Sequence, residues 1–600
     1  ISIRLGSALF ALTQHNGRRP VQGLRRIIRR GDAFRSHHGG NVALLFAFMS
    51  VPMLMLGGAA IDYGFATRLE AKLQVSTDST ALLLCQTPMT TSTADLNTLA
   101  QTTLNGAMGA TNLVVDPLTV TSNPRQITLS AHKLSTTFFG KLTGTTRINP
   151  GATSQCATPI PKTFEIALVL DNTGSMAESS GTQSKMQAVQ QAATNFVNYV
   201  YANSSFSSAT RISIVPFAAA VAVDPTTYRN ASWIDQNAQS SYHWTNVLNA
   251  SGSNFSNRFD IFSKLKSANP NWGWAGCLET LPYPLNVQDG APNSSNMDSY
   301  FVPLFAPDEP GDGSTSYADY PDPNGTTYRS YNSYIADTDG SYNGKCGTKN
   351  SATSYLPLEG QACKYVNPRN ATSNTALGIP NGPNFMCSTQ PLVTLTNNTT
   401  ALKAAISNMA PSGSTNIHEG FMWGWRTLSP LSVFTSSPTI GSPPAAYATA
   451  SSSSNATAIN KILILMTDGY NSWTSNPNSP NGSLYFSTGY FRNSNPLNAK
   501  TSTANTRLPP ANQNVSDGTS ARNALDALTA QACSNAKAVN ISIYTIAFSV
   551  SSDPIDSAGQ ALLQNCASSA SQYFLANTSD DLIAAFQKIQ SSIGALRLTQ

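Results

Sequence analysis

FEIALVLDNTGS, residues 164–175, is the stretch of sequence that decides the fold. Its first seven residues are apolar apart from Glu165, a pattern typical of a strand buried on both faces of a parallel sheet. The chain then turns at Gly174 and enters an amphipathic segment, whose apolar face consists of Met186, Val189, Ala193, Phe196 and Val200. One carboxylate and two hydroxyls therefore lie on a loop at the carboxyl end of a strand, where open α/β sheets place their ligand sites.

Two later stretches supply similar groups. Residues 412–417, SGSTNI, form a glycine-containing loop with a hydroxyl at Thr415. Residues 461–469, KILILMTDG, predict a second buried strand that ends in the carboxylate of Asp468. The three segments offer only oxygen ligands, which hard divalent cations such as Mg²⁺ prefer. The sequence therefore predicts a divalent-cation site, and the alternative is a set of N-cap and turn residues of an ordinary α/β sheet.

In this order the three segments resemble the metal-ion-dependent adhesion site of von Willebrand factor type A (VWA) domains. The resemblance implies that one divalent cation is held by Asp171, Thr173, Ser175, Thr415 and Asp468. Mg²⁺ is the expected ion, with Mn²⁺ and Ca²⁺ as alternatives. Thr173 stands where the family usually has Ser, and it keeps the hydroxyl. The resemblance also implies a doubly wound, Rossmann-like α/β fold and a protein partner that supplies an acidic residue to the metal.

Charged residues are scarce and unevenly placed. They make up 11% of the 600 residues, against roughly 25% in soluble proteins, which favours an exported protein over a cytosolic enzyme. Residues 1–38 carry a net charge of +7, whereas the whole chain carries +5, so the rest is slightly acidic. A nucleic-acid groove needs basic residues spread over a folded face. We therefore predict a basic cytoplasmic tail at 1–38 and no binding of nucleic acid.

An uncharged apolar run follows the tail at residues 42–61 and is long enough to span a bilayer as a helix. We predict a transmembrane helix at 40–61. Arginines on one side of it and none close by on the other place the N-terminus in the cytoplasm and the bulk of the chain outside. The alternative is a signal peptide cleaved near residues 57–60, but this apolar core is too long for that class.

Residues 62–158 are predicted to continue the helix to about residue 84 and then to form a small Thr-rich α+β domain. A helix is expected near 94–107, and alternating runs at 118–121 and 126–129 predict strands. A long apolar helix that leads into a small sheet is the shape of pilin-like proteins.

Residues 39–46, GGNVALLF, resemble the N-terminal region of TadG-type Tad (Flp) pilus-assembly proteins. That family joins such an anchor to a type A domain on the exported side. The resemblance implies a single-pass protein of the bacterial inner membrane, with its bulk periplasmic or surface-exposed and with pilus or envelope components as partners. Prepilin-like members carry a Glu shortly after the cleavage glycine, whereas this chain has Leu44, Leu45 and Phe46 there.

The remaining residues, 160–600, alternate strands with helices and predict a doubly wound parallel sheet. Further strands are expected at 211–215 and 541–548, and helices at 398–410, 418–428, 519–538 and 579–595. Three long insertions are expected at about 225–397, 430–458 and 474–516.

Eight cysteines all follow the apolar run, and none forms a C-x-x-C pair that would indicate zinc or a thioredoxin-like site. An even number in an exported chain favours four disulfides. We expect Cys85–Cys156 around the small domain and Cys533–Cys566 in the last α/β unit. Three pairings are open in the first insertion, of which Cys277–Cys387 with Cys346–Cys363 nested inside avoids threading.

Single motifs are compatible with two other kinds of site. Asp308, Asp312, Asp319, Asp322, Asp337 and Asp339 could bind Ca²⁺, but the 337–342 stretch lacks the Gly and the final Glu of an EF-hand loop, which favours solvated turns. Ser175, His418 and Asp468 could form a hydrolytic triad, but Ser175 is not in a G-x-S-x-G turn.

We therefore expect no enzyme. The predicted function is that of a membrane-anchored exported VWA protein of Tad/Flp pilus assembly, which binds a partner through its metal site. A cell-surface adhesin for host or matrix ligands is the alternative, and a hydrolase is a more distant one.

Overall fold

The computed structural model describes residues 41–87, 91–109, 113–121, 126–142, 144–157, 163–203, 206–247, 253–309, 318–321, 327–335, 361–368, 375–435, 443–448, 459–477, 482–492 and 504–595. The chain divides into two compact units, Ile1–Thr158 and Pro159–Gln600. Each unit has its own hydrophobic core.

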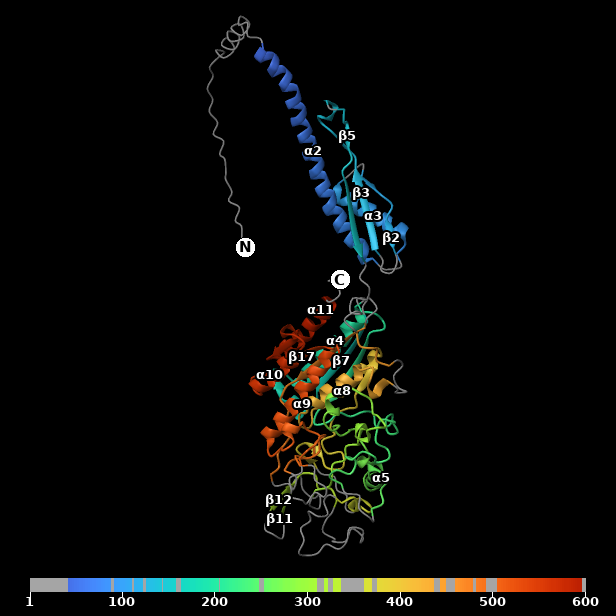
Figure 1. The fold of residues 1–600 in the computed structure, drawn as a ribbon, viewed down its shortest axis with the longest axis vertical. Helices are drawn as coiled ribbons and strands as arrows, with labels where there is room; N and C mark the ends of the chain where they lie inside the picture. The colour runs from blue at the N-terminus through green and yellow to red at the C-terminus, as the bar shows by residue number, and fades with distance from the viewer. Residues whose placement is uncertain are drawn as a thin grey trace, which may run out of the picture. The chain divides into compact units, whose positions relative to one another are not determined.

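The N-terminal unit is built on one 46-residue helix, α2 (Asn41–Gln86), which is long enough and apolar enough to cross a membrane. The first half of α2 is apolar and exposed, whereas its second half packs on α3 (Thr93–Met108) and on a small sheet (Figure 1). The packed half contributes Leu73, Ala81 and Leu84 to the core, which faces Ile127 and Leu129 of the sheet. The predicted long helix with a small α+β domain is confirmed.

The small sheet is antiparallel, with β3 (Gln126–Lys133) at its centre. One edge of β3 pairs with β1 (Leu113–Val115) and β2 (Thr119–Thr121), and the other edge pairs with β6 (Gly151–Ala157). The predicted disulfide Cys85–Cys156 joins the end of α2 to β6. A hairpin between β3 and β6 consists of β4 (Ser135–Thr136), the short helix η1 (Gly140–Leu142) and β5 (Arg147–Ile148).

The second unit contains a six-stranded sheet centred on β7 (Phe164–Asp171). Its order is β15 (Val393–Thr396), β10 (Arg211–Phe217), β7, β16 (Asn460–Thr467), β17 (Ser542–Phe548) and β18 (Tyr573–Ala576). Numbered along the chain, this order is 3-2-1-4-5-6, the doubly wound arrangement whose direction reverses between strands 1 and 4. The carboxyl ends of β7 and β16 therefore meet at the switch point of the sheet.

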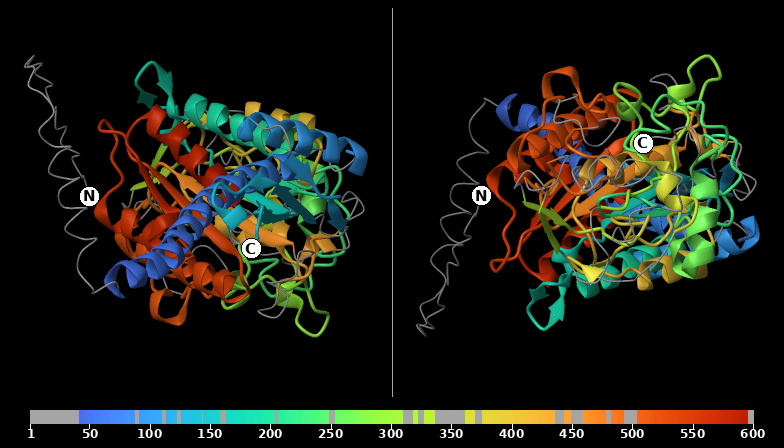
Figure 2. Two further views of the ribbon diagram at one scale, coloured as in Figure 1. Left: turned by 90° about the horizontal axis from the view of Figure 1, so that it is seen from above. Right: turned by 90° about the horizontal axis from the view of Figure 1, so that it is seen from below.

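Helices cover both faces of this sheet (Figure 2). On one face lie α4 (Lys185–Ala202), α7 (Thr399–Ser407) and α11 (Ser579–Ala595), and on the other lie α8 (Ile417–Leu428), α9 (Gly518–Ala538) and α10 (Ser557–Cys566). Alternate residues of β7 enter the two cores, Ile166 and Leu168 on the α4 side and Ala167 and Val169 on the α8 side. This is why the strand is apolar without alternation. The predicted apolar face of α4 is buried throughout, and the doubly wound α/β fold is confirmed.

The prediction of a parallel sheet is wrong at one edge. β15 runs antiparallel to β10. The sequence alone predicts that the residues of β15 form the end of the first insertion. β15 has four residues of which only one is buried, so it lacks the long apolar run that marks a buried strand. β18 was not predicted either, for the same reason of short length, and α10 was also missed.

The first and third insertions gather at the carboxyl ends of the strands (Figure 1), whereas the described residues of the second, 430–458, lie at their amino ends, where Ala445 N–H donates to Glu165 near the start of β7. Their elements are α5 (Arg258–Ala268), the hairpins β11 (Ala318–Pro321) with β12 (Thr327–Ser330) and β13 (Thr375–Ala376) with β14 (Ile379–Pro380), and several single turns of 3-10 helix. Their apolar residues join the core on the α8 side of the sheet. The predicted disulfides Cys277–Cys387 and Cys533–Cys566 are present, whereas Cys346 of the fourth predicted pair lies outside the described residues.

Candidate functional site

Asp171 is the last residue of β7 and is fully buried. Its Oδ1 accepts hydrogen bonds from the backbone N–H of Thr173 at 2.8 Å and from the Thr173 hydroxyl at 2.6 Å. Its Oδ2 accepts a 2.6 Å hydrogen bond from the hydroxyl of Thr467, at the end of the neighbouring strand β16. The carboxylate is therefore held in one orientation at the switch point of the sheet.

Asp468 follows β16 directly and is also buried. Its Oδ1 accepts a 2.8 Å hydrogen bond from the hydroxyl of Ser175. The hydroxyl oxygens of Thr173 and Ser175 lie 3.0 Å apart. Four of the five predicted ligands thus form one continuous cluster across β7 and β16.

Thr415, the fifth predicted ligand, is brought to the same edge by backbone contacts. Its loop is tied to the Asp171 loop, because Gly174 N–H donates to the carbonyl of Gly413 and Ser412 N–H donates to that of Asn172, both at 2.9 Å. The carbonyl of Thr415 accepts from Ser472 N–H at 2.8 Å. A methyl group built on Gly469 would lie 3.9 Å from the Thr415 hydroxyl, which places that hydroxyl beside the turn after β16.

Lys185 is a member of this site that sequence reasoning missed. Its side chain is fully buried, and its Nζ lies 2.8 Å from Asp468 Oδ2 and 2.7 Å from Asp553 Oδ2. Burial lowers the pKa of Lys185, but the carboxylates of Asp468 and Asp553 outweigh that effect and raise it. One feature of the sequence could have indicated that Lys185 has acidic partners. It is the first residue of a helix, where the helix dipole disfavours a cation without anionic neighbours.

The two carboxylates of the site are short of positive charge. Burial, and then repulsion by Asp468, raise the pKa of Asp171 to about 7 against the hydrogen bonds from Thr173 and Thr467. Burial also raises the pKa of Asp468, although Lys185 acts in the opposite direction. Ionising both carboxyl groups therefore costs free energy, and the attraction of a nearby cation would offset that cost.

The oxygen geometry fits a divalent cation. The hydroxyl of Thr173 donates its single hydrogen to Asp171, and the hydroxyl of Ser175 donates its own to Asp468. The lone pairs of the two hydroxyl oxygens therefore face each other across 3.0 Å. Neighbouring ligands of an octahedral ion with metal–oxygen bonds of about 2.1 Å lie about 3.0 Å apart. The residues present therefore suit Mg²⁺ in spacing and in donor type. No group of three or more His, Cys, Asp or Glu side chains that could hold a metal occurs within the described ranges. The predicted donor set would not form such a group, because three of its five members are hydroxyls.

The structure does not assemble the hydrolytic triad of Ser175, His418 and Asp468. Ser175 donates directly to Asp468, with no imidazole between them. His418 is buried at the start of α8, where its Nε2 bonds the carbonyl of Asn286 at 2.8 Å. Burial lowers the pKa of His418.

Asp308 does not lie in a solvated turn. It is buried, it pairs with Lys364 at 2.6 Å, and it accepts hydrogen bonds from the backbone of Tyr334 and Ile335. Its role is to hold the insertion together. Asp312, Asp322, Asp337 and Asp339 lie outside the described residues, and Asp319 lies in β11.

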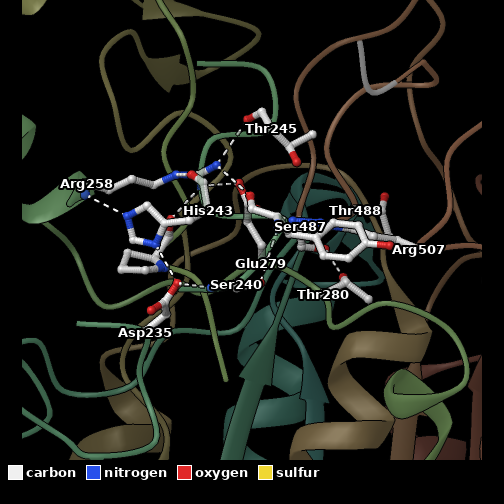
Figure 3. A network of polar contacts seen from close by, with 12 residues as sticks. Asp235, Ser240, His243, Thr245, Arg258, Glu279, Thr280, Ser487, Thr488 and Arg507 are labelled. Atoms are coloured by element: carbon white, nitrogen blue, oxygen red, sulfur yellow. Dashed lines mark hydrogen bonds and ion pairs between the residues drawn. The ribbon is translucent and has the colours of Figure 1, made fainter. Parts of the chain in front are cut away.

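A buried polar network supports the Thr415 loop from the side of the insertions (Figure 3). Glu279 lies between Arg258 and Arg507 and pairs with both. Its neighbour Thr280 bonds Glu419 of α8 at 2.5 Å and Ser487 at 3.2 Å. Ser487 in turn accepts a 2.9 Å hydrogen bond from Asn416, the residue after Thr415 and the N-cap of α8.

His243 completes the network as a neutral imidazole. Its Nε2 accepts the backbone N–H of Arg258 at 2.9 Å, so the hydrogen on Nδ1 points to Asp235 at 2.8 Å. Burial lowers the pKa of His243. The network is fully enclosed, and its role is to fix the insertions on α8.

Comparison with known proteins identifies the N-terminal segment. Residues 40–83 match the family model described as "Putative Flp pilus-assembly TadE/G-like", which confirms the resemblance predicted from residues 39–46. The protein thus joins a TadE/G-like apolar helix to a doubly wound α/β unit. No curated protein matches the chain.

Similar solved structures include three pilus proteins. The pilus adhesin SpaC from Lactobacillus rhamnosus GG is 11% identical, with a TM-score of 0.29, over 82% of this chain and 35% of that chain. The vWF domain of the type V pili tip protein Mfa5 from Porphyromonas gingivalis is 10% identical, with a TM-score of 0.28, over 73% of this chain and 97% of that one. The pilus adhesin RrgA from Streptococcus pneumoniae is 9% identical, with a TM-score of 0.28, over 80% and 49%. The chain thus spans about a third of the length of SpaC.

Proposed function

We propose that this protein is a membrane-anchored, exported component of a Tad/Flp pilus-assembly system, and that it binds an acidic segment of a protein partner through a divalent cation. Asp171, Thr173, Ser175, Thr415 and Asp468 hold the cation, Mg²⁺ in the first place. The observation that carries the proposal is the pair of hydroxyl oxygens 3.0 Å apart between two buried carboxylates. The bound cation supplies a positive charge on which a carboxylate of the partner docks.

The surroundings of the site have room for such a segment. A polar cleft of about 410 Å³ is lined by residues 179–183, 550–552 and 577–580, next to the loop that carries Asp553. Its walls come from the β8 (Ser179–Ser180) and β9 (Gln183–Ser184) hairpin and from the loops after β17 and β18. The partner's chain enters this cleft, and its acidic residue reaches the cation.

The TadE/G-like segment supports the location. Helix α2 is the anchor, and the basic residues before it keep the N-terminus in the cytoplasm, so that both folded units are exported. The α/β unit then faces pilus or envelope components in the periplasm or at the cell surface.

The test is binding by the full chain in detergent. Calorimetry with Mg²⁺ is expected to give one site, which Asp171→Ala removes and Asp581→Asn, at an exposed carboxylate on α11, leaves unchanged. Equal Mg²⁺ binding by the wild type and by Asp171→Ala would contradict the metal site. A pull-down from envelope fractions with Mg²⁺ or EDTA then separates a pilus component from a host or matrix ligand.

A further inference from the structure

The β4–β5 hairpin of the N-terminal unit lies along α2 (Figure 1). Its tip carries exposed aromatic side chains. The tip consists of Phe138 and Phe139, which are 74% and 41% exposed. Leu134, at the base of the hairpin, is 44% exposed. Three large apolar side chains on one small hairpin leave an apolar surface that the rest of the unit does not cover.

The tip is fixed to α2 at one level of that helix. The carboxylate of Asp62 accepts the backbone N–H of Phe138 at 2.8 Å and that of Phe139 at 2.9 Å. The ring of Phe138 lies 5.7 Å from that of Phe65. Phe139 packs so closely on Gly58 that a methyl group there would lie 2.7 Å from its Cβ. These contacts join the hairpin to α2 over residues 58–65.

This level is the end of the apolar half of α2. Residues 42–61 carry no charge, and Asp62 is the first ionisable residue after them. Apolar side chains of that half are exposed, as Met53 at 75% and Leu56 at 71% show. With a rise of about 1.5 Å per residue the uncharged stretch spans about 30 Å, the thickness of the hydrocarbon core. The aromatic tip thus lies where α2 leaves the bilayer.

The charge of the hairpin fits the same location. Residues 133–148 contain Lys133, Lys141 and Arg147 and no acidic residue. Lys141 and Arg147 are exposed. Aromatic side chains next to basic ones are the composition that proteins place at membrane interfaces, where rings enter the acyl boundary and cations meet anionic headgroups.

We propose that the β4–β5 hairpin is an interfacial membrane anchor, whose Phe138 and Phe139 enter the outer boundary of the bilayer that α2 spans and whose basic residues contact anionic lipid headgroups. Helix α2 and the hairpin then hold the small domain at two points. Two points fix its depth and its rotation about the helix axis, which a single helix leaves free. The proposal rests on α2 as a membrane span and is independent of the metal site.

The experiment measures depth at three labelled positions in the full chain, reconstituted in vesicles of phosphatidylcholine with phosphatidylglycerol. Met49→Cys, Phe138→Cys and Leu82→Cys each receive an environment-sensitive fluorophore without reduction, and the unsubstituted chain gives the labelling background. Leu82 is the matched control, since it is an exposed apolar residue of α2, 61% exposed and about 30 Å beyond Asp62. Lipids with a nitroxide near the headgroup act as quenchers for position 138, at the boundary of the bilayer. Lipids with a nitroxide deep in the acyl chain act as quenchers for position 49, near its centre, and both kinds are applied to position 82.

The expected result is quenching and blue-shifted emission at positions 49 and 138, and neither at 82. Replacing phosphatidylglycerol by phosphatidylcholine weakens the quenching at 138, and Lys141→Glu removes that difference between the two vesicles. Quenching at 49 with none at 138 overturns the proposal and leaves the helix as the sole anchor. A blue shift at 138 without lipid quenching would mean that the tip contacts a second copy of the chain. Absence of quenching at 49 would mean that α2 does not span the bilayer. Either result also overturns the proposal.

Discussion

Replacing Asp171 by Asn changes how the stability of the second unit depends on pH. The pKa of Asp171 is raised from 3.8 to about 7 by burial and by Asp468, so the folded state binds this proton more tightly than the unfolded state does. Stability from this group is fully present below pH 3.8 and is lost as pH rises through 7. The difference is about 4 kcal/mol at most, at about 1.36 kcal/mol for each unit of pKa.

This loss converts into a measurable shift of Tm. The second unit has about 440 residues, so its unfolding entropy is about 0.9 kcal/mol per kelvin and 4 kcal/mol corresponds to about 4 °C. All seven tryptophans lie in this unit, which makes intrinsic fluorescence a selective probe in the full chain. In EDTA, the Tm of Asp171→Asn relative to the wild type is expected to rise by about 4 °C between pH 4 and pH 8.

Mg²⁺ should offset most of that difference in Tm. At 100 times its Kd a ligand adds about 2.7 kcal/mol, which is about 3 °C for the wild type at pH 8 and nothing for Asp171→Asn. Asp581→Asn, at an exposed position, is the control and should follow the wild type in both conditions. Parallel pH profiles for the wild type and Asp171→Asn, or an equal Mg²⁺ response, would refute the argument.

Three further predictions concern single contacts. Lys185→Met removes the buried cation beside Asp468 and should destabilise the metal-free second unit by about 3–5 kcal/mol, measured by denaturant unfolding followed by tryptophan fluorescence; a loss below 1 kcal/mol would contradict a buried ion pair. Asp62→Ala removes two charge-assisted hydrogen bonds, which should lower the local stability of the tip by about 2 kcal/mol and speed amide hydrogen exchange at Phe138 and Phe139 by about 30-fold. Unchanged protection of these amides would show that the aromatic rings alone hold the tip. Cys533→Ser with Cys566→Ser opens a loop of sequence separation 33 and should cost about 3–4 kcal/mol, whereas a Tm equal to the wild type would show that the helices alone order this region.

The sheet could be predicted where its signals are local. β7 and β16 carry runs of apolar residues that few other structures tolerate, and α4 has an apolar face at helical spacing. β15 and β18 have four residues each and lie at the two edges of the sheet. Each of these strands forms because it pairs with the strand beside it in the sheet. A segment of four residues is too short for its own sequence pattern to predict that pairing.

The same distinction applies to the site. Asp171, Thr173, Ser175 and Asp468 follow apolar strands, so their position at the carboxyl edge could be predicted. Lys185 and Thr467 could not, because their partners are far away in the chain: Lys185 bonds residues 283 and 368 positions away, and Thr467 bonds one 296 positions away. Contacts of that range exist only once the sheet has formed.

The placement of the scarce charges bears on the proposed metal site. Only 11% of the residues are charged, yet many of these lie inside, in pairs such as Glu165 with Lys461 and Asp308 with Lys364. A buried carboxylate is tolerated when a cation lies against it. Asp171 has no Lys or Arg partner among the described residues and faces a second carboxylate instead, which is the charge arrangement on which our proposal of a divalent cation rests. The proposed cation would account together for the raised pKa of Asp171, the hydroxyl spacing and the position at the switch point.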